Sequence, residues 1–156
     1  MESSDMVVVD NINFSIKISP KVNELWWSYR QVKAKDCEVF GVLIGNKNLN
    51  EENYSVLEVT VPQHDDLCSR TSFKLRDPEH QRRVDYLHKN SGGELIYLGT
   101  WHTHPEKIPL ASNIDVQDWK ECRLRNIERQ LFFIIIGTEK NALYYFENEN
   151  LQHQEF

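Results

Sequence analysis

The sequence is short of the features that mark several large classes of protein. No apolar run among its 156 residues is long enough to span a bilayer, which argues against a transmembrane helix. The stretch MESSDMVVVDNINF has neither a basic start nor a long apolar core, so we expect no secretory signal. Internal repeats, low-complexity tracts and long Gly/Ser/Pro linkers are also missing. We therefore expect a single domain over residues 1–156, with its core between about residues 14 and 147.

Cysteine and positive charge are scarce as well. Cys37, Cys68 and Cys122 are odd in number and widely spaced, so neither a disulfide framework nor a cysteine-type zinc site is expected. The 18 lysines and arginines face 24 acidic residues, giving a net charge of −6. This argues against a general nucleic-acid binder, because phosphate neutralisation needs a basic surface. We expect a soluble cytoplasmic protein with reduced thiols and with neither a nucleic-acid nor a membrane partner.

The apolar patterns along the chain predict an alternation of strands and helices. Strands are expected over residues 14–18, 37–46, 54–62, 94–102, 130–137 and 141–148, and helices over 19–35, 77–90 and 112–126. Residues 63–75 are polar and irregular, and we expect a surface loop or a poorly formed strand there. Short hairpin connections rule out an all-parallel sheet, so the order predicts an α/β sandwich on a mixed sheet.

Four polar residues stand out where the fourth of these strands ends. His102 and His104 are two positions apart, so on a strand both imidazoles face the same way and can reach one ion. An isolated H-x-H is weak evidence, because most histidines are surface residues or satisfied core residues. Ser112 and Asp115 match a capping box, which alone explains both. The same spacing also puts Ser112 and Asp115 on one helix face, from which both side chains can point toward the histidines.

Two histidines and one aspartate leave one position of a tetrahedral zinc site free. Three protein ligands plus water is the pattern of catalytic zinc sites, and it lowers the pKa of the bound water to about 7. A general base that does not bind the ion is still needed. Glu38 is the candidate, because it is the one acid at the start of an otherwise apolar run. Ser112 is a candidate donor to the oxyanion that forms during hydrolysis.

These residues resemble the motif of the JAMM (MPN+) metalloprotease family. The matching positions are Glu38, the run His102-Thr103-His104-Pro105, Ser112 and Asp115, with the family's spacing intact. The resemblance implies a JAB/MPN fold, which is a curved mixed β-sheet flanked by helices, similar to cytidine deaminases. It implies one Zn²⁺ ion with a catalytic water, held by His102, His104 and Asp115. It also implies Glu38 as the acid/base and Ser112 as the oxyanion stabiliser.

Softer features resemble a bacterial subgroup of this family. They are the run GTWHTHPE, a proline-containing loop and a tryptophan after the motif aspartate. Such enzymes accompany E1/E2-type conjugation proteins in anti-phage operons of the CBASS type, where they release a conjugated CD-NTase, or in bacterial ubiquitin-like (BIL) operons. The resemblance implies a protein substrate with an extended C-terminal tail, and residues 64–73 are a candidate wall of its groove. Leu110-Ala111 departs from the subgroup's usual Pro-Ser, which we expect to alter the shape of the loop.

Two other functions stay open. One is trimming of the C-terminus of a ubiquitin-like or sulfur-carrier protein, which the motif does not separate from isopeptide cleavage. The other is a non-catalytic scaffold or reader of ubiquitin-like folds, which the intact Glu38 argues against. A nucleoside deaminase is excluded because no H-x-E with C-x-x-C is present. A RadC-like role lacks the Ser-Gly after His-Pro, and no cysteine-protease pattern surrounds any cysteine.

Overall fold

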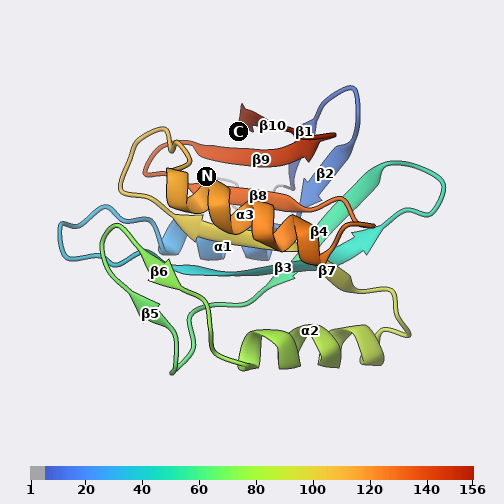
Figure 1. The fold of residues 1–156 in the computed structure, drawn as a ribbon, viewed down its shortest axis with the longest axis horizontal. Coiled ribbons are helices and arrows are strands. Elements are labelled where there is room, and N and C mark those ends of the chain that lie inside the picture. The colour runs from blue at the N-terminus through green and yellow to red at the C-terminus, as the bar shows by residue number, and fades with distance from the viewer. Residues whose placement is uncertain (1–5) are drawn as a thin grey trace.

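A mixed β-sheet of eight strands forms the centre of the computed structural model, which describes residues 6–156 (Figure 1). The sheet order is β1-β2-β4-β3-β7-β8-β9-β10, and β5 and β6 form a separate small hairpin. The strands are β1 (Val7–Asp10), β2 (Ser15–Ile18), β3 (Phe40–Lys47), β4 (Asn53–Val59), β5 (Leu67–Cys68), β6 (Phe73–Lys74), β7 (Ile96–Thr103), β8 (Phe132–Ile136), β9 (Asn141–Glu147) and β10 (Asn150–Glu155). The helices are α1 (Pro20–Ser28), α2 (Glu79–Asn90) and α3 (Asn113–Arg125).

Two parallel pairs make the sheet mixed, as the sequence predicted. β2 pairs in parallel with β4, and β7 pairs in parallel with β8 after a crossover through α3. The other neighbours in the sheet are antiparallel. Register shifts in β3 mark irregularities that bend the sheet. Gly99 lies near one of them with φ of 134°, and a Cβ there would stand 1.8 Å from the Phe132 carbonyl oxygen.

The helices α1 and α3 cover opposite faces of this sheet (Figure 1). Successive side chains of β8 point to opposite faces of the sheet. Phe132 and Ile134 pack with Trp26 of α1 on one face, whereas Phe133 packs with Trp119 of α3 on the other. The helix α2 lies along the face that α3 covers only in part, and it contacts β3 and β7. None of the helices formed by residues 6–156 combines the length and hydrophobicity that a bilayer crossing requires.

The first helix is shorter than predicted. Ser19 caps it and Pro20 opens it, as expected, but the helix ends at Ser28 and does not reach residue 35. The chain turns because Gln31 is buried, and its side chain bonds to distant groups. Its amide donates to the Asp36 and Arg70 carbonyls, and its oxygen accepts a 2.8 Å bond from Thr103 Oγ1. These tertiary bonds outweigh the local preference for another two turns of helix.

The strand that was expected to begin at residue 37 begins at Phe40 instead. Glu38 therefore precedes β3, and its backbone N–H donates to the Ser69 carbonyl at 2.7 Å. The N–H of Val39 donates to the side-chain oxygen of Thr103 at 2.9 Å, which ends the regular pairing with β7. The sequence also missed β1 and β10. Both lie at sheet edges, and β10 has the polar sequence NLQHQE, which carries no apolar alternation.

Candidate metal centre

The two histidines stand at the end of the central strand β7. His102 lies across from Phe40 of β3 and Ile135 of β8, so neighbouring strands fix its backbone on both sides. His104 follows the strand, and its N–H continues the ladder with a 3.0 Å bond to the Ile136 carbonyl. Both side chains are buried. The period of two along β7 therefore brings both imidazoles to one face at one end of the sheet.

The helix α3 begins directly beside these histidines. Ser112 is its N-cap, and the Ser112 hydroxyl accepts a 3.0 Å bond from the backbone N–H of Asp115. In return, Asp115 Oδ2 accepts a 2.9 Å bond from the backbone N–H of Ser112. The capping box expected from the spacing is thus confirmed. The cap also sets the rotamer of Asp115, whose carboxylate is buried and faces the two imidazoles.

His102, His104 and Asp115 converge on one small volume. Their ligand atoms all lie within 4.8 Å of one another. The two Nε2 atoms are 3.1 Å apart, and the Asp115 oxygens lie 3.3 Å from His102 Nε2 and 3.2 Å from His104 Nε2. Burial alone would raise the pKa of Asp115, but bonds from both histidines hold it well below its usual range. Two imidazole nitrogens and a carboxylate oxygen that meet in a buried place fit a metal ion.

Glu106 supports this group from outside. Its Oε1 lies 2.8 Å from His104 Nδ1, on the side of the ring away from His102 and Asp115. A carboxylate in this position favours the tautomer that carries its proton on Nδ1 and leaves Nε2 free to face the cluster. No role in the site was predicted for Glu106 from the sequence. Its position two residues after His104 is the signal that was available.

Glu38 lies beside the cluster without joining it. Its Oε1 is 3.9 Å from His104 Nε2, and only 4% of the residue is exposed. Burial raises the pKa of Glu38 to about 7, the nearby charge of Asp115 adds to this rise, and His104 opposes it. A carboxyl group with this pKa exchanges a proton readily near neutral pH. Ser112, by contrast, lies at an exposed position at the rim.

The β5–β6 hairpin forms a second wall beside the histidines. Phe73 of β6 stacks on Phe40 with ring centroids 4.5 Å apart, and its ring lies 4.9 Å from that of His102. A cavity of about 350 Å³ runs between this hairpin and α3. Its lining includes Phe73, Lys74, Asp115 and Trp119. The cavity therefore reaches the cluster at Asp115.

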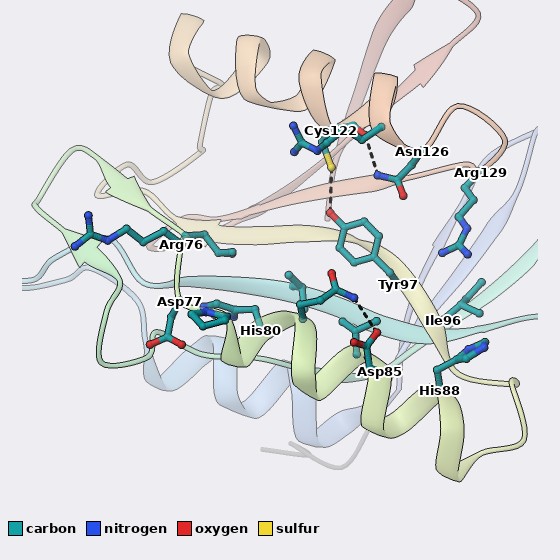
Figure 2. A pocket seen from close by; sticks show the side chains of 16 residues that line it. Arg76, Asp77, His80, Asp85, His88, Ile96, Tyr97, Cys122, Asn126 and Arg129 are labelled. Atoms are coloured by element: carbon teal, nitrogen blue, oxygen red, sulfur yellow. Dashed lines mark hydrogen bonds between the residues drawn. The ribbon is translucent and has the colours of Figure 1, made fainter.

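A larger cavity of about 520 Å³ adjoins it between α2 and α3 (Figure 2). The two cavities share Val42, Leu75, Tyr97, Cys122 and Arg125, so they form one continuous groove across β3 and β7. The groove has the metal cluster at one end and the start of β7 at the other.

Comparison with known proteins agrees with this geometry. A family model described as prokaryotic homologs of the JAB domain matches residues 28–149. The chain belongs to this family. The resemblance predicted from the motif and the α/β fold with a curved mixed sheet are therefore confirmed. Membership of the JAB family and the buried cluster of His102, His104 and Asp115 together fit a metal site.

Several curated relatives carry the name CD-NTase/cGAS isopeptidase. One from Escherichia coli (strain TW11681) is 33% identical over 119 residues, which make up 76% of this chain and 75% of the relative. One from Vibrio cholerae serotype O1 is 32% identical over 141 residues, covering 89% of this chain and 86% of the relative. A third, from Pseudomonas aeruginosa, is 29% identical over 130 residues, covering 83% and 80%.

Proposed function

We propose that this protein is a zinc-dependent isopeptidase that cleaves after the C-terminus of a conjugated protein and so reverses its attachment to a target. The substrate we propose is a CD-NTase, or a ubiquitin-like protein, joined through an extended C-terminal tail by E1/E2-type machinery in a CBASS anti-phage operon. The names of the curated relatives support the substrate class. We place the reaction in the cytoplasm, since the chain's three cysteines are free thiols.

The observation that carries the proposal is the buried cluster of His102, His104 and Asp115 with Glu38 next to it. Two nitrogens and one oxygen with a fourth position open are the donor set of a catalytic zinc site. When bound there, a zinc ion supplies Lewis acidity, which polarises a carbonyl and lowers the pKa of water. Glu106 supports this choice, because carboxylates that orient ligand histidines commonly accompany zinc.

Glu38 is the proposed proton carrier. Its raised pKa lets the carboxylate accept a proton from the attacking water at neutral pH. It then holds this proton and returns it to the leaving lysine amine. Because Glu38 lies 3.9 Å from His104 Nε2, its carboxyl group stands beside the reacting position and is not a ligand in this arrangement. Its burial keeps bulk water from competing for the proton.

Ser112 is the proposed oxyanion donor, and its role in the helix cap does not conflict with that. Its oxygen accepts from the Asp115 N–H, which leaves the hydroxyl hydrogen free. A hydroxyl that is fixed in this way donates to a developing oxyanion without reorganising. The groove beside the hairpin gives the substrate tail a place to lie before the scissile bond reaches the cluster.

The test is a cleavage assay with defined fusions. A CD-NTase, a ubiquitin-like protein and a sulfur carrier are each joined through the C-terminus to a reporter, by a peptide bond or by an isopeptide bond to lysine. We expect cleavage at the CD-NTase or ubiquitin-like joint, loss of cleavage in EDTA, and recovery with Zn²⁺. Cleavage of the sulfur-carrier fusion alone would point to C-terminal trimming instead.

The Glu38→Ala variant separates an enzyme from a scaffold. We expect cleavage to fall about 10²–10⁴-fold, the usual contribution of a general acid/base. Zinc content and substrate binding, measured by metal analysis and titration calorimetry, should stay close to wild type. A variant that still cleaves at the wild-type rate would refute the role of Glu38. Wild-type binding without cleavage of any fusion would favour a reader of ubiquitin-like folds.

A further inference from the structure

Two of the three cysteines lie together at the edge of the metal centre. Cys37 immediately precedes Glu38, and Cys68 belongs to β5 of the hairpin. The 2.7 Å bond from the Glu38 N–H to the Ser69 carbonyl brings these two segments side by side. Both thiols are free, Cys68 is exposed and Cys37 is partly so. Oxidants therefore reach this pair.

The side chains of the two cysteines are also close enough to influence each other. The neighbouring Cys37 thiol raises the pKa of Cys68 to about 11, and partial burial and the charge of Glu38 add to this rise. Two thiols this close have a high effective concentration toward each other.

The pair is connected to the metal centre on both sides. Cys68 lies directly across from Phe73 in the register of the hairpin. Phe73 in turn stacks on Phe40 and lies beside His102. On the other side, Cys37 is bonded through the chain to Glu38. A bond between the two sulfurs therefore ties the hairpin that walls the groove to the segment that carries the proposed acid/base.

We propose that Cys37 and Cys68 form a reversible disulfide that turns down cleavage when a peroxide is present. One thiol attacks hydrogen peroxide, the O–O bond breaks, and a sulfenic acid and a water molecule form. The sulfur of the second cysteine then attacks the sulfenic sulfur, which forms the S–S bond and releases a second water. Overall, two thiols lose two hydrogens and one peroxide becomes two waters. A dithiol reductant reverses the reaction by thiol–disulfide exchange.

The effect on cleavage rests on the proposed function. A covalent link stops the hairpin from moving relative to Glu38 when a substrate tail enters the groove. It also perturbs the position of Glu38, where small displacements are costly to the reaction. We expect kcat/KM to fall about tenfold on oxidation and to return on reduction. The metal cluster itself contains no thiol, so peroxide does not act by oxidising a ligand.

The test treats the reduced, zinc-loaded protein with hydrogen peroxide, blocks the remaining thiols with iodoacetamide and maps linked peptides by mass spectrometry. We expect a Cys37–Cys68 peptide in the wild type and none in Cys68→Ser or Cys37→Ser. Cleavage of the fusion by the wild type should fall about tenfold with peroxide and return with a dithiol reductant, whereas cleavage by Cys68→Ser should resist peroxide. Cys122, which is buried on α3 and lies 3.1 Å from the Tyr97 hydroxyl, stays in every protein tested, so any oxidation of this thiol is common to all of them.

The outcomes separate this inference from the function. The peroxide dose is chosen so that Cys68 no longer reacts with iodoacetamide. If the reduced protein cleaves but no Cys37–Cys68 peptide forms at that dose, the disulfide is refuted. If the peptide forms and cleavage is unchanged, or if Cys68→Ser loses activity like the wild type, the control of cleavage is refuted. If the linked peptide forms but the reduced protein cleaves no fusion, the proposed function fails and the disulfide remains.

Discussion

The two walls of the metal centre are held by different kinds of interaction. The first wall is the end of β7 and the start of α3, which carries His102, His104 and Asp115. Strands on both sides fix β7, and a complete capping box fixes the first turn of α3. The second wall is the hairpin segment, residues 63–77, whose two strands have only two residues each. Most of its residues are exposed or half-buried, so apolar burial alone does not hold it.

A buried polar network holds the hairpin segment at its base. The Asp66 carboxylate accepts four hydrogen bonds. Its Oδ1 accepts from the backbone N–H groups of Arg76 and Asp77, each at 2.8 Å. Its Oδ2 accepts from the Gln63 N–H at 2.8 Å and from His80 Nε2 at 2.6 Å. One carboxylate therefore joins the two ends of the segment to each other and to α2. Every bond is to a charged acceptor, which makes this network stronger than a set of neutral bonds.

The network continues into the core through a single histidine. Thr60 Oγ1 lies 2.6 Å from His80 Nδ1 and accepts a 2.8 Å bond from the Val42 N–H. A neutral His80 with its proton on Nε2 satisfies the whole chain, because Thr60 then donates to Nδ1 and His80 donates to Asp66. The hairpin is thus tied to β3 by polar groups, whereas the ligands are tied by backbone pairing.

This difference indicates that the first wall serves metal binding and the second wall serves substrate entry. Groups that must meet one ion within a few tenths of an ångström stand on the central strand and a capped helix. The wall that must admit a peptide stands on a segment with little burial and a polar anchor, which is typical of parts that move on binding. Changes in the first wall should act on metal and kcat, and changes in the second should act on KM.

The largest effect on cleavage within these walls is expected at Ser112. Ser112→Ala removes both the cap and the proposed oxyanion donor, so we expect kcat to fall about 10²–10³-fold. We also expect the free energy of unfolding to fall by about 1 kcal/mol, the typical cost of losing a cap. Rates from the fusion assay and urea unfolding measure the two effects separately.

Ser112→Gly is the matched variant, because glycine at an N-cap costs only a few tenths of a kcal/mol. We expect it to lose the same catalytic rate as alanine with most of the stability kept. If Ser112→Gly instead cleaves like the wild type, then Ser112 serves only as the helix cap.

A smaller effect is expected at Glu106, which supports the first wall from outside. Glu106→Gln weakens the hydrogen bond to His104 Nδ1, so the affinity for zinc should fall about 10–100-fold. Competition with a chelator of known affinity measures this change. Cleavage should recover at saturating zinc. Glu139→Gln is the control and should have no effect, because Glu139 is exposed and its side chain pairs with Lys107. Unchanged zinc affinity would mean that Glu106 does not orient His104.

The first wall was largely predictable from the sequence because its geometry is local. Strand period places His102 and His104 on one face, and the capping spacing places Ser112 beside Asp115. The closeness of Glu38 to His104, however, joins residues more than sixty positions apart. No periodicity encodes that contact, and only the family resemblance indicated it. The start of β3 was misplaced for a related reason, since Glu38 pairs with Ser69 of the hairpin segment.

The second wall was not predictable in the same way. A surface loop or a poorly formed strand was expected over residues 63–75, and the chain forms two strands of only two residues there. The buried carboxylate of Asp66 at the base of this hairpin was not expected. Asp66 and His80 are fourteen residues apart. The sequence predicts a loop at Asp66 and a helix at His80, and nothing in either pattern indicates that the two side chains meet. Gln31, which ends α1 early, likewise bonds to groups on three other segments. Long-range polar bonds of this kind leave no trace in local patterns.

The smallest effect on cleavage is expected at Asp66, and it should appear in KM. Asp66→Asn replaces one carboxylate oxygen by an NH₂ group, which donates and does not accept. In one orientation this group faces the donors of Gln63 and His80, and in the other it faces the N–H groups of Arg76 and Asp77, so two hydrogen bonds are lost either way. We expect about 2–3 kcal/mol of stability to be lost with these bonds and KM to rise about tenfold, with zinc content unchanged. Asp65→Asn is the control, because that side chain is exposed and bonds only to the neighbouring His64. A loss of zinc equal to the rise in KM would show that the two walls are not independent.

The pH dependence of this stability has a definite sign. Burial alone would raise the pKa of Asp66, but its bonds from backbone N–H groups and His80 lower it below the usual value. A carboxyl with a lowered pKa in the folded state contributes stability above its unfolded pKa of about 4, and loses it as the pH falls through the folded value. The stability gap between wild type and Asp66→Asn, measured by urea unfolding, should therefore be full at pH 7 and should shrink below about pH 4. A gap that stays constant into the acid range would mean that shape, and not the charge of Asp66, holds the hairpin segment to the rest of the molecule.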